Sequence, residues 1–267
     1  MPEPSSSPDI LIRRVETLAE YDECVRIERE TWGETFTEMV SATVLRITQE
    51  MGGVTAAAFD ASGAMLGFVF GITGVRFGEL AHWSDMLAVR PHAQNLGLGT
   101  RLKHFQRDQL VPLGVRRMYW TYDPLVARNA HLNLQRLGAR AAEYRVNFYG
   151  EDTGSVVHAG LGTDRFIIDW EFASAGPREI TPRPDAPIAN PTDGSGTPAT
   201  IELPDADAVR ILIPPDIHAV LSSAPAVARQ WRATTRRAFE WYLGRGYRVA
   251  GFDRGDSSGF PAYIITR

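Results

Sequence analysis

The stretch Leu80-Ala-His-Trp-Ser-Asp-Met-Leu-Ala-Val89, followed by Arg90-Pro-His-Ala-Gln-Asn-Leu-Gly-Leu-Gly99, decides the fold of this chain. The first part is a mostly apolar run, which predicts a buried or half-buried strand. The second part contains a proline and closely spaced glycines, which predict a turn. Apolar residues then recur at helical spacing until Gly114, a residue type that ends helices. The stretch therefore predicts a strand, a glycine turn and a helix in succession.

The predicted turn is suited to binding an anion. A side chain at Gly97 or Gly99 would keep a ligand away from the backbone amides, whereas glycine allows close approach. The free N–H groups of the first helical turn point towards such a ligand, and the helix dipole adds to the attraction. Thr100 adds a hydroxyl group beside these amides. We therefore expect the turn to bind a phosphate or a pyrophosphate.

Three kinds of phosphate-binding turn compete for this spacing. The dinucleotide fingerprint G-x-G-x-x-G requires a third glycine where the chain has Leu102, and no G-K-[ST] sequence follows at P-loop spacing. The pattern V-x-P-x-x-Q-x-x-G-x-G does fit. Its members are Val89, Pro91, Gln94, Gly97 and Gly99. This pattern resembles the acyl-CoA turn of the GNAT superfamily of N-acyltransferases; the alternative is an ordinary strand-to-helix turn whose glycines only reverse the chain.

The order of the expected elements also resembles that of the GNAT fold. We expect strands at residues 10–15, 54–59, 64–72, 80–89, 117–122, 144–149 and 165–172. We expect helices at residues 19–32, 37–51, 98–113 and 127–137. The resemblance implies an α/β (α+β) fold, in which a central mixed, largely antiparallel sheet is flanked by helices.

Composition suggests how the chain divides into domains. Residues 1–8 are expected to be a disordered lead, residues 9–173 the acyltransferase domain, and residues 174–200, rich in Pro and Gly, a linker or long surface loop. Residues 201–267 are expected to form a small extension with a strand, a helix and two further strands. Such a short segment is too small for a large core of its own, so we expect it to pack on the first domain.

Charge and cysteine content exclude several classes of function. The chain has 267 residues and a formal net charge of -4, which gives no general attraction to nucleic acid or to an anionic membrane. No apolar run is long enough to span a bilayer, and the first residues lack the pattern of a secretory signal. Cys24 is the single cysteine, so a reducing cytoplasm is the simplest setting. The histidines lack metal-ligand spacing, and we expect no metal.

The resemblance implies which residues hold acyl-CoA as a co-substrate. In GNAT enzymes the strand before the turn lines the pantetheine arm, which implies this role for Leu87, Ala88 and Val89. The pyrophosphate would be held by the turn and the first helical residues, Gln94, Asn95, Gly97, Leu98, Gly99 and Thr100. Asn129, near the start of the next expected helix, would contact pantetheine or cap that helix.

The attacking amine must lose a proton, so a base or a chain of water molecules is needed. Strict alternation along the strand places Trp83, Asp85, Leu87 and Val89 on one face and His82, Ser84 and Met86 on the other. Asp85 would then be a carboxylate in an apolar row, where burial raises the pKa. His82 is the second candidate. The alternative is that Asp85 pairs with an arginine and that His82 has a structural role.

One departure from the family concerns the general acid. Many GNAT enzymes have a tyrosine in the helix after the fifth strand, where it protonates the leaving thiolate. Alignment on Leu137-Gly138 puts Leu134 at that position, so the acid is unassigned. A thiolate leaves readily, so an acyl-CoA-dependent N-acyltransferase is the leading interpretation. A non-catalytic acyl-CoA-binding or sensing module is the alternative.

Other segments resemble a bacterial GNAT subgroup with a C-terminal extension, some members of which are associated with N-acylamino-acid racemases. They are residues 120–125, 128–133 and 163–166 and the helix around Arg229-Gln-Trp-Arg-Ala-Thr-Thr-Arg236. The resemblance implies transfer of an acetyl or succinyl group to a small-molecule amine such as a free amino acid, with a homodimer as one candidate assembly. We expect Arg229, Arg232 or Arg236 to meet a substrate carboxylate. The alternative is a solvated basic face.

Overall fold

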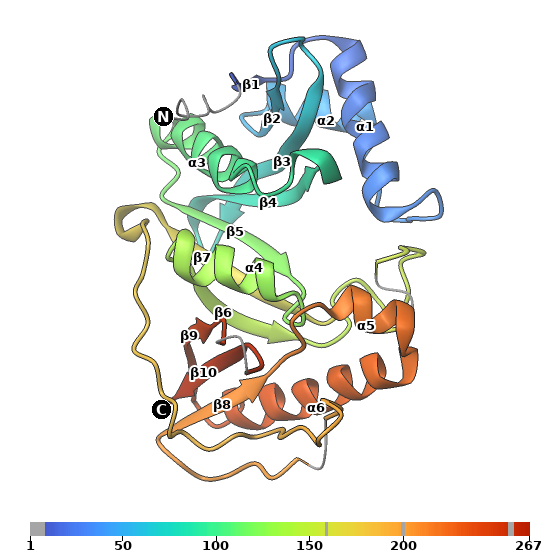
Figure 1. Ribbon diagram of the computed structural model, residues 1–267. Coiled ribbons are helices and arrows are strands. Elements are labelled where there is room, and N and C mark those ends of the chain that lie inside the picture. The colour runs from blue at the N-terminus through green and yellow to red at the C-terminus, as the bar shows by residue number, and fades with distance from the viewer. Residues whose placement is uncertain (1–8, 158–159, 199–200, 256–258) are drawn as a thin grey trace, which may run out of the picture. The chain divides into compact units, whose positions relative to one another are not determined.

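The computed structural model describes residues 9–157, 160–198, 201–255 and 259–267, and Figure 1 shows its helices and strands. The expected disordered lead, residues 1–8, lies outside these ranges. Within them, no helix is both long enough and apolar enough to cross a membrane.

The chain forms two compact units. Unit 1 comprises Met1–Trp120 and Gly154–Val156, and unit 2 comprises Thr121–Thr153 and Val157–Arg267. Packing thus divides the chain after residue 120, whereas the sequence places the first domain boundary after residue 173. The sequence-based division stays a prediction.

Unit 1 is built from β-strands and the α-helices α1, α2 and α3. Its elements are β1 (Leu11–Arg14), α1 (Leu18–Trp32), α2 (Ala42–Glu50), β2 (Val54–Phe59), β3 (Met65–Arg76), β4 (Glu79–Val89), α3 (Leu98–Leu110) and most of β5 (Arg117–Tyr122). Thr17 and Glu20 form a capping box that starts α1. The α2 helix begins later than the expected residue 37 because the side chain of Ser41 accepts a hydrogen bond from the N–H of Val44 and caps it there.

The strands follow the order β1-β2-β3-β4-β5-β7-β6 in a seven-stranded sheet. Neighbouring strands β1 to β4 are antiparallel, as are β6 and β7, whereas β4 and β5 are parallel. The mixed, largely antiparallel sheet flanked by helices that the sequence predicts is therefore confirmed.

Both faces of the strands in unit 1 are covered. A buried cluster joins Cys24 and Ile27 of α1 and Leu45 of α2 to Phe68 and Phe70 of β3. On the other face, α3 contacts β2, β3 and β4. All six residues of β2 are buried, as expected for a strand with apolar neighbours on both sides.

A β-bulge interrupts β4 at Asp85. Met86 pairs with Phe70 of β3, and Ser84 pairs with the next residue, Gly71, so Asp85 has no partner residue in β3. A bulge of this kind adds one residue to one strand and redirects the side chains that follow it.

The bulge changes which face the side chains of β4 occupy. Before it, Ser84 lies on the α3 face and accepts a hydrogen bond from Lys103. After it, Met86 belongs to the cluster formed with α1 and α2. The expected alternation, which put Met86 on the same face as His82 and Ser84, is wrong because one extra residue reverses the pattern.

Unit 2 holds the end of β5 and the remaining elements. They are α4 (Ala127–His131), which continues as a π-helical turn (Leu132–Arg136), β6 (Arg140–Arg145), β7 (Arg165–Glu171), β8 (Ala208–Leu212), α5 (Ile217–Ser223), α6 (Pro225–Leu243), β9 (Arg248–Asp253) and β10 (Ala262–Thr266). Three strands form a second, antiparallel sheet in the order β8-β10-β9. The strand expected at residues 144–149 lies four residues earlier, as β6, and α5, which Asp216 caps, was not expected.

The C-terminal elements of unit 2 pack on β6 and β7 through aromatic rings. The ring of Phe166 on β7 lies 4.8 Å from that of Phe239 on α6 and 5.5 Å from that of Tyr263 on β10. The Pro-rich segment from residue 174 is a packed loop at Asn190, whose buried side chain exchanges hydrogen bonds with the backbone of Leu212. These two hydrogen bonds hold the loop against β8.

Candidate functional site

The turn after β4 exposes backbone donors at the start of α3. Asn95 and Gly97 have left-handed backbone conformations, with φ of 68° and 72°. No side chain caps α3, and a Cβ atom added to Gly97 would meet nothing within 4 Å among the described residues. The first intrahelical bond runs from the N–H of Arg101 to the carbonyl of Gly97. The N–H groups of residues 98–100 therefore remain for a ligand, and a pyrophosphate fits them.

One edge of β4 leads directly into this turn. The β4–β5 ladder consists of His82 with Met118 and Trp83 with Tyr119, although β4 continues to Val89. In the described part of unit 1, the edge beyond Trp83 has no strand partner. The opposite edge stays paired with β3 as far as Val89.

The open edge carries hydrogen-bonding groups of Leu87 and Val89. The N–H of Arg90 donates to the carbonyl of Leu66 in the direction of β3, at 2.9 Å. Because successive residues of a strand point their N–H and C=O groups to opposite edges, those of Val89 and Leu87 point to the open edge. The side-chain amide of Gln94 lies 3.3 Å from the carbonyl of Val89. An extended amide-bearing chain such as pantetheine fits this edge as an added strand.

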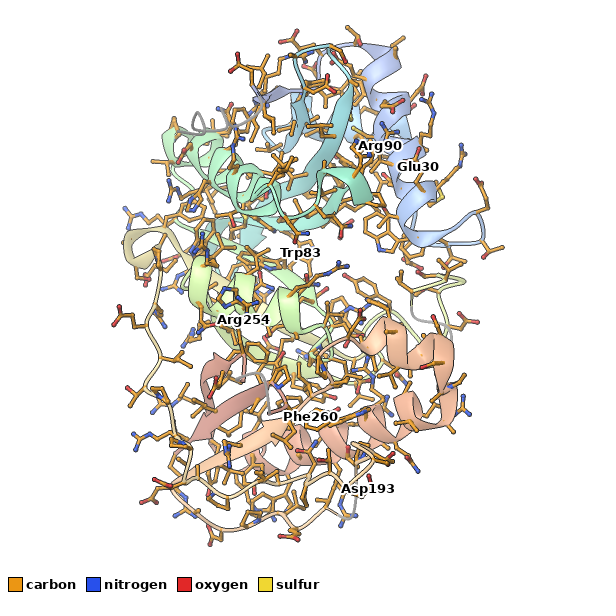
Figure 2. The ribbon with its side chains drawn as sticks, viewed as in Figure 1. Glu30, Trp83, Arg90, Asp193, Arg254 and Phe260 are labelled. Atoms are coloured by element: carbon orange, nitrogen blue, oxygen red, sulfur yellow. The ribbon has the colours of Figure 1, made fainter. Side chains whose placement is uncertain are left out.

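The arginines around the turn are engaged elsewhere. Arg90 forms ion pairs with two acids of α1, at 2.9 Å to Glu30 and 2.6 Å to Glu23, and Figure 2 shows Arg90 beside Glu30. Arg101 donates to the carbonyl of Ile10 at 2.8 Å. An anion at this turn would therefore be held chiefly by backbone N–H groups.

Asp85 projects from the bulge. Its side chain is largely exposed, and the protein around the carboxyl nevertheless raises its pKa by desolvation, while a hydrogen bond with Trp83 lowers it. Asp85 is therefore open to solvent on one side, while the protein desolvates its carboxyl group on the other. Asp85 thus lies on the strand that leads into the turn, but it is exposed and, because of the bulge, is not part of the regular row with Leu87 and Val89 that strict alternation predicts.

Glu28 on α1 is a second carboxyl group, which the sequence analysis missed. Its side chain is fully buried, and burial raises its pKa to about 7, with a smaller contribution from the charge of Asp85. The signal was present in the sequence: Tyr21, Cys24 and Glu28 follow one another at helical spacing, which places an acid on the apolar face of α1.

His82 lies inside the α3 face of unit 1. Its ring is fully buried, and Nδ1 is 2.9 Å from the hydroxyl of Thr73. Burial and the nearby Lys103 lower its pKa to about 3, so the ring is neutral at physiological pH. Its Nε2 has no hydrogen-bond partner among the described residues. A ring with so low a pKa is a weak base at neutral pH.

The residues expected on α4 belong to unit 2. The half-buried Asn129 does not cap its helix. Leu134 is buried in the π-helical turn. The tyrosine hydroxyls nearby are engaged: that of Tyr122 lies 3.2 Å from that of Tyr263, and that of Tyr144 donates to Asp164. The general acid therefore stays unassigned.

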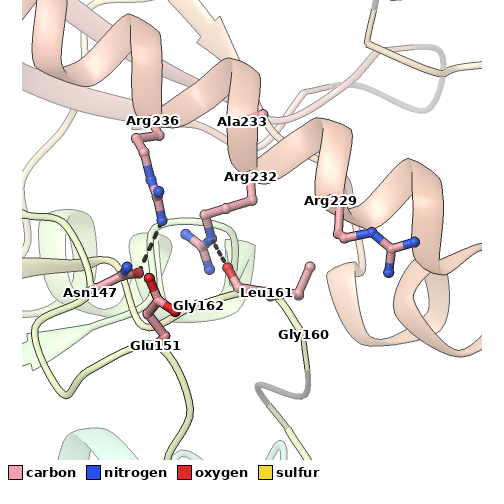
Figure 3. Close-up of a pocket in the computed structure, with 9 residues that line it drawn as sticks. All are labelled: Asn147, Glu151, Gly160, Leu161, Gly162, Arg229, Arg232, Ala233 and Arg236. Carbon is pink, nitrogen blue, oxygen red and sulfur yellow. Dashed lines mark hydrogen bonds between the residues drawn. The ribbon is translucent and has the colours of Figure 1, made fainter.

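The three arginines predicted on the C-terminal helix come together in unit 2. Arg229, Arg232 and Arg236 line a pocket of about 390 Å³ with residues of the segment 147–162, and Figure 3 shows them on one side of α6. Arg232 pairs with Asp123 at 2.6 Å, and Arg236 pairs with Asp164 at 2.7 Å. Arg229 is exposed and forms no ion pair within the described ranges.

Comparison with known proteins gives structural similarities only. No protein-family model and no curated protein sequence matches the chain. The ribosomal-protein-S18-alanine N-acetyltransferase from Escherichia coli is 22% identical, covers 64% of this chain and 99% of its own, and has a TM-score of 0.46. A putative acetyltransferase from Acinetobacter baylyi is 14% identical over 67% and 99% of the two chains, with a TM-score of 0.49. Arabidopsis thaliana NAA60 is 15% identical over 61% and 99%, with a TM-score of 0.47.

Proposed function

We propose that the chain is an N-acyltransferase that moves an acyl group from acyl-CoA to a primary amine by direct attack in a ternary complex. One observation carries the proposal. The open edge of β4, at Leu87 and Val89, runs into an uncapped helix start whose turn leaves backbone N–H groups free. An amide-bearing arm ending in a pyrophosphate needs these two features in this order.

In this proposal the residues of unit 1 hold the donor. The backbone at Leu87 and Val89 binds the pantetheine amides, with Ala88 between them in the core. The turn from Gln94 through Gly97 and the first residues of α3 bind the pyrophosphate. A backbone N–H on the open edge polarises the thioester carbonyl and stabilises the charge that develops on its oxygen.

Asp85 takes the proton of the attacking amine. The nitrogen of the amine forms a bond with the thioester carbon, the carbon–sulfur bond breaks, and the sulfur leaves as a thiolate. The proton lost by the amine passes to the carboxylate of Asp85, directly or through water. Glu28 is the nearby acid that titrates close to neutral pH, so its charge changes the affinity of Asp85 for that proton.

The acyl group and the acceptor are the finer part of the proposal. The resemblance of the segment around Arg229 to the subgroup with a C-terminal extension supports acetyl or succinyl transfer to a small-molecule amine, such as a free amino acid. The single cysteine, Cys24, supports a cytoplasmic setting.

A non-catalytic acyl-CoA-binding module is the second candidate. The buried Leu134 occupies the position at which the resemblance implies a tyrosine that acts as the general acid. Thiol release separates the two. An enzyme releases CoA only in step with an N-acylated acceptor, whereas a binding module retains acyl-CoA when amines are added.

A further inference from the structure

The pocket on α6 contains an arginine whose hydrogen-bonding capacity is only partly used. Arg232 is buried, with 4% of its surface exposed. Its Nη2 donates to Asp123 at 2.6 Å, and its Nε donates to the carbonyl of Leu161 at 3.1 Å. Its Nη1 is buried and has no partner among the described residues. Since a guanidinium has five N–H donors, a buried nitrogen without an acceptor is unusual and calls for one.

The neighbouring Arg236 is fixed in the same way. Its guanidinium donates to both oxygens of Asp164, and to the side chain of Asn147 at 3.1 Å, as Figure 3 shows for Asn147. Asp164 also accepts from Tyr144, so its position is set from two sides. Arg232 and Arg236 are therefore held rigidly at the pocket wall by buried acids.

Arg229 differs from the other two. It lies one helical turn before Arg232 on α6, is exposed, and forms no hydrogen bond or ion pair with another described residue. Among the described residues that line the pocket, Glu151 is the one acid, and it forms no hydrogen bond or ion pair with another described residue. The charges left after pairing are thus one free arginine, one buried guanidinium with a free nitrogen, and one free carboxylate.

We propose that this pocket binds a small ligand through one carboxylate group, with Arg229 and the Nη1 of Arg232 as the binding groups and Arg236 as a positioning residue. A carboxylate matches the planar fork of a guanidinium in charge and in geometry. Glu151 repels anions at the pocket wall, and this repulsion grows with each negative charge that a ligand carries. The volume of about 390 Å³ suits a ligand of metabolite size. This binding is independent of acyl transfer and requires no acyl-CoA.

The test uses the full chain without CoA and two probes of nearly equal shape. Monomethyl glutarate carries one carboxylate, and dimethyl glutarate carries none. Ligand-observed NMR titration should show binding of the monoester and none of the diester. Arg229→Ala should weaken monoester binding by about tenfold or more, because the charge-assisted bonds are lost. Glu151→Gln should leave it equal or stronger.

Arg237→Ala is the matched control, because Arg237 is an exposed arginine on the same helix that does not line the pocket. It should leave monoester binding unchanged. Equal binding of the neutral diester, unaltered binding in Arg229→Ala, or an equal loss in Arg237→Ala would overturn the proposal. Since the substituted residues belong to the pocket and to α6 and not to the turn after β4, these outcomes do not depend on whether the chain transfers acyl groups.

Discussion

The backbone N–H of Val40 donates a 2.9 Å hydrogen bond to Oε2 of Glu28, a carboxyl group with no exposed surface. The other oxygen, Oε1, has no hydrogen-bond partner in the described part of the chain. A charged carboxylate in this position is only half satisfied, whereas the protonated form carries no net charge into the core. This explains why burial raises the pKa of Glu28 to about 7.

The first prediction concerns the pH dependence of stability. The pKa of Glu28 is about 7 in the folded chain and 4.5 as the reference, so the folded state binds this proton more tightly. The resulting stabilisation is complete below the reference pKa and is lost as the pH rises through 7. Relative to Glu28→Gln, the wild-type free energy of unfolding should fall by up to about 3 kcal/mol between acidic and mildly basic pH.

Urea denaturation of both proteins across this pH range measures the effect. Glu79→Gln removes an exposed acid and serves as the control. It should give a pH-independent offset. A constant difference between wild type and Glu28→Gln at all pH values would show that Glu28 does not titrate in this range.

The second prediction concerns Asp85. Asp85→Asn keeps the size of the side chain and removes its basicity. It should lower kcat by about 10²- to 10⁴-fold, with little change in acyl-CoA affinity. The acidic limb of the pH–rate profile should move or disappear. Asp22→Asn, an exposed change on α1, should do neither. Near-normal kcat with an unaltered acidic limb in Asp85→Asn would exclude Asp85 and direct attention to His82 or a water chain.

The third prediction uses two glycines of equal conformation at opposite ends of one helical segment. Gly97 and Gly114 have φ of 72° and 83°, and an added Cβ atom would meet nothing within 4 Å at either. Substitution by alanine at either site should therefore lower the free energy of unfolding by a similar amount, about 1–2 kcal/mol, because alanine is strained in this conformation. Only Gly97→Ala should also weaken CoA binding in calorimetry, because it alters the turn in which the N–H groups converge. Equal CoA affinity in the two variants would remove the turn from the donor site.

The fourth prediction concerns the buried acid that supports α6. Asp123 accepts from Arg232 at 2.6 Å and lies 3.8 Å from Arg165. Burial raises its pKa, but these two cations outweigh the burial effect, so the pKa is lowered. Asp123→Asn removes a buried negative charge that faces two buried cations and should destabilise the chain by about 3–5 kcal/mol. The control Asp185→Asn, at an exposed position, should change the free energy of unfolding little.

Because the pKa of Asp123 is lowered, its stabilising contribution is present above the reference pKa and is lost as the pH falls. A loss below about 1 kcal/mol in thermal or urea denaturation would contradict the assigned ion pairs.

Local patterns predicted much of the fold. Strands 54–59 and 117–122 agree with the structure to the residue, because glycines or aspartate bound both runs sharply. The bulge at Asp85 was not predictable, since it depends on how β3 and β4 pair and leaves no mark on the apolar pattern. The missed helix α5 is only seven residues long, too short for a periodic signal.

The site was predictable in its backbone parts more than in its charged parts. Gly97 adopts a left-handed conformation that glycine readily accepts, so the glycine motif in the sequence was sufficient to predict a turn there. Which arginine is free and which is paired depends on distant acids: Asp123 and Asp164 lie far from Arg232 and Arg236 in the sequence. For the same reason, the pKa of Glu28 depends on burial that only the packed core reveals.

The most direct test of the account is a coupled assay of thiol release and acceptor modification. The purified chain is incubated with acetyl-CoA or succinyl-CoA and a panel of amines, amino acids and peptides. Free thiol is followed by absorbance and N-acylated product by mass spectrometry. The account predicts that at least one amine gives N-acyl product in equal amount to the CoA released, and that Asp85→Asn slows both together. Acyl-CoA that binds at the turn without any acceptor-dependent release, or that fails to bind at all, would contradict it.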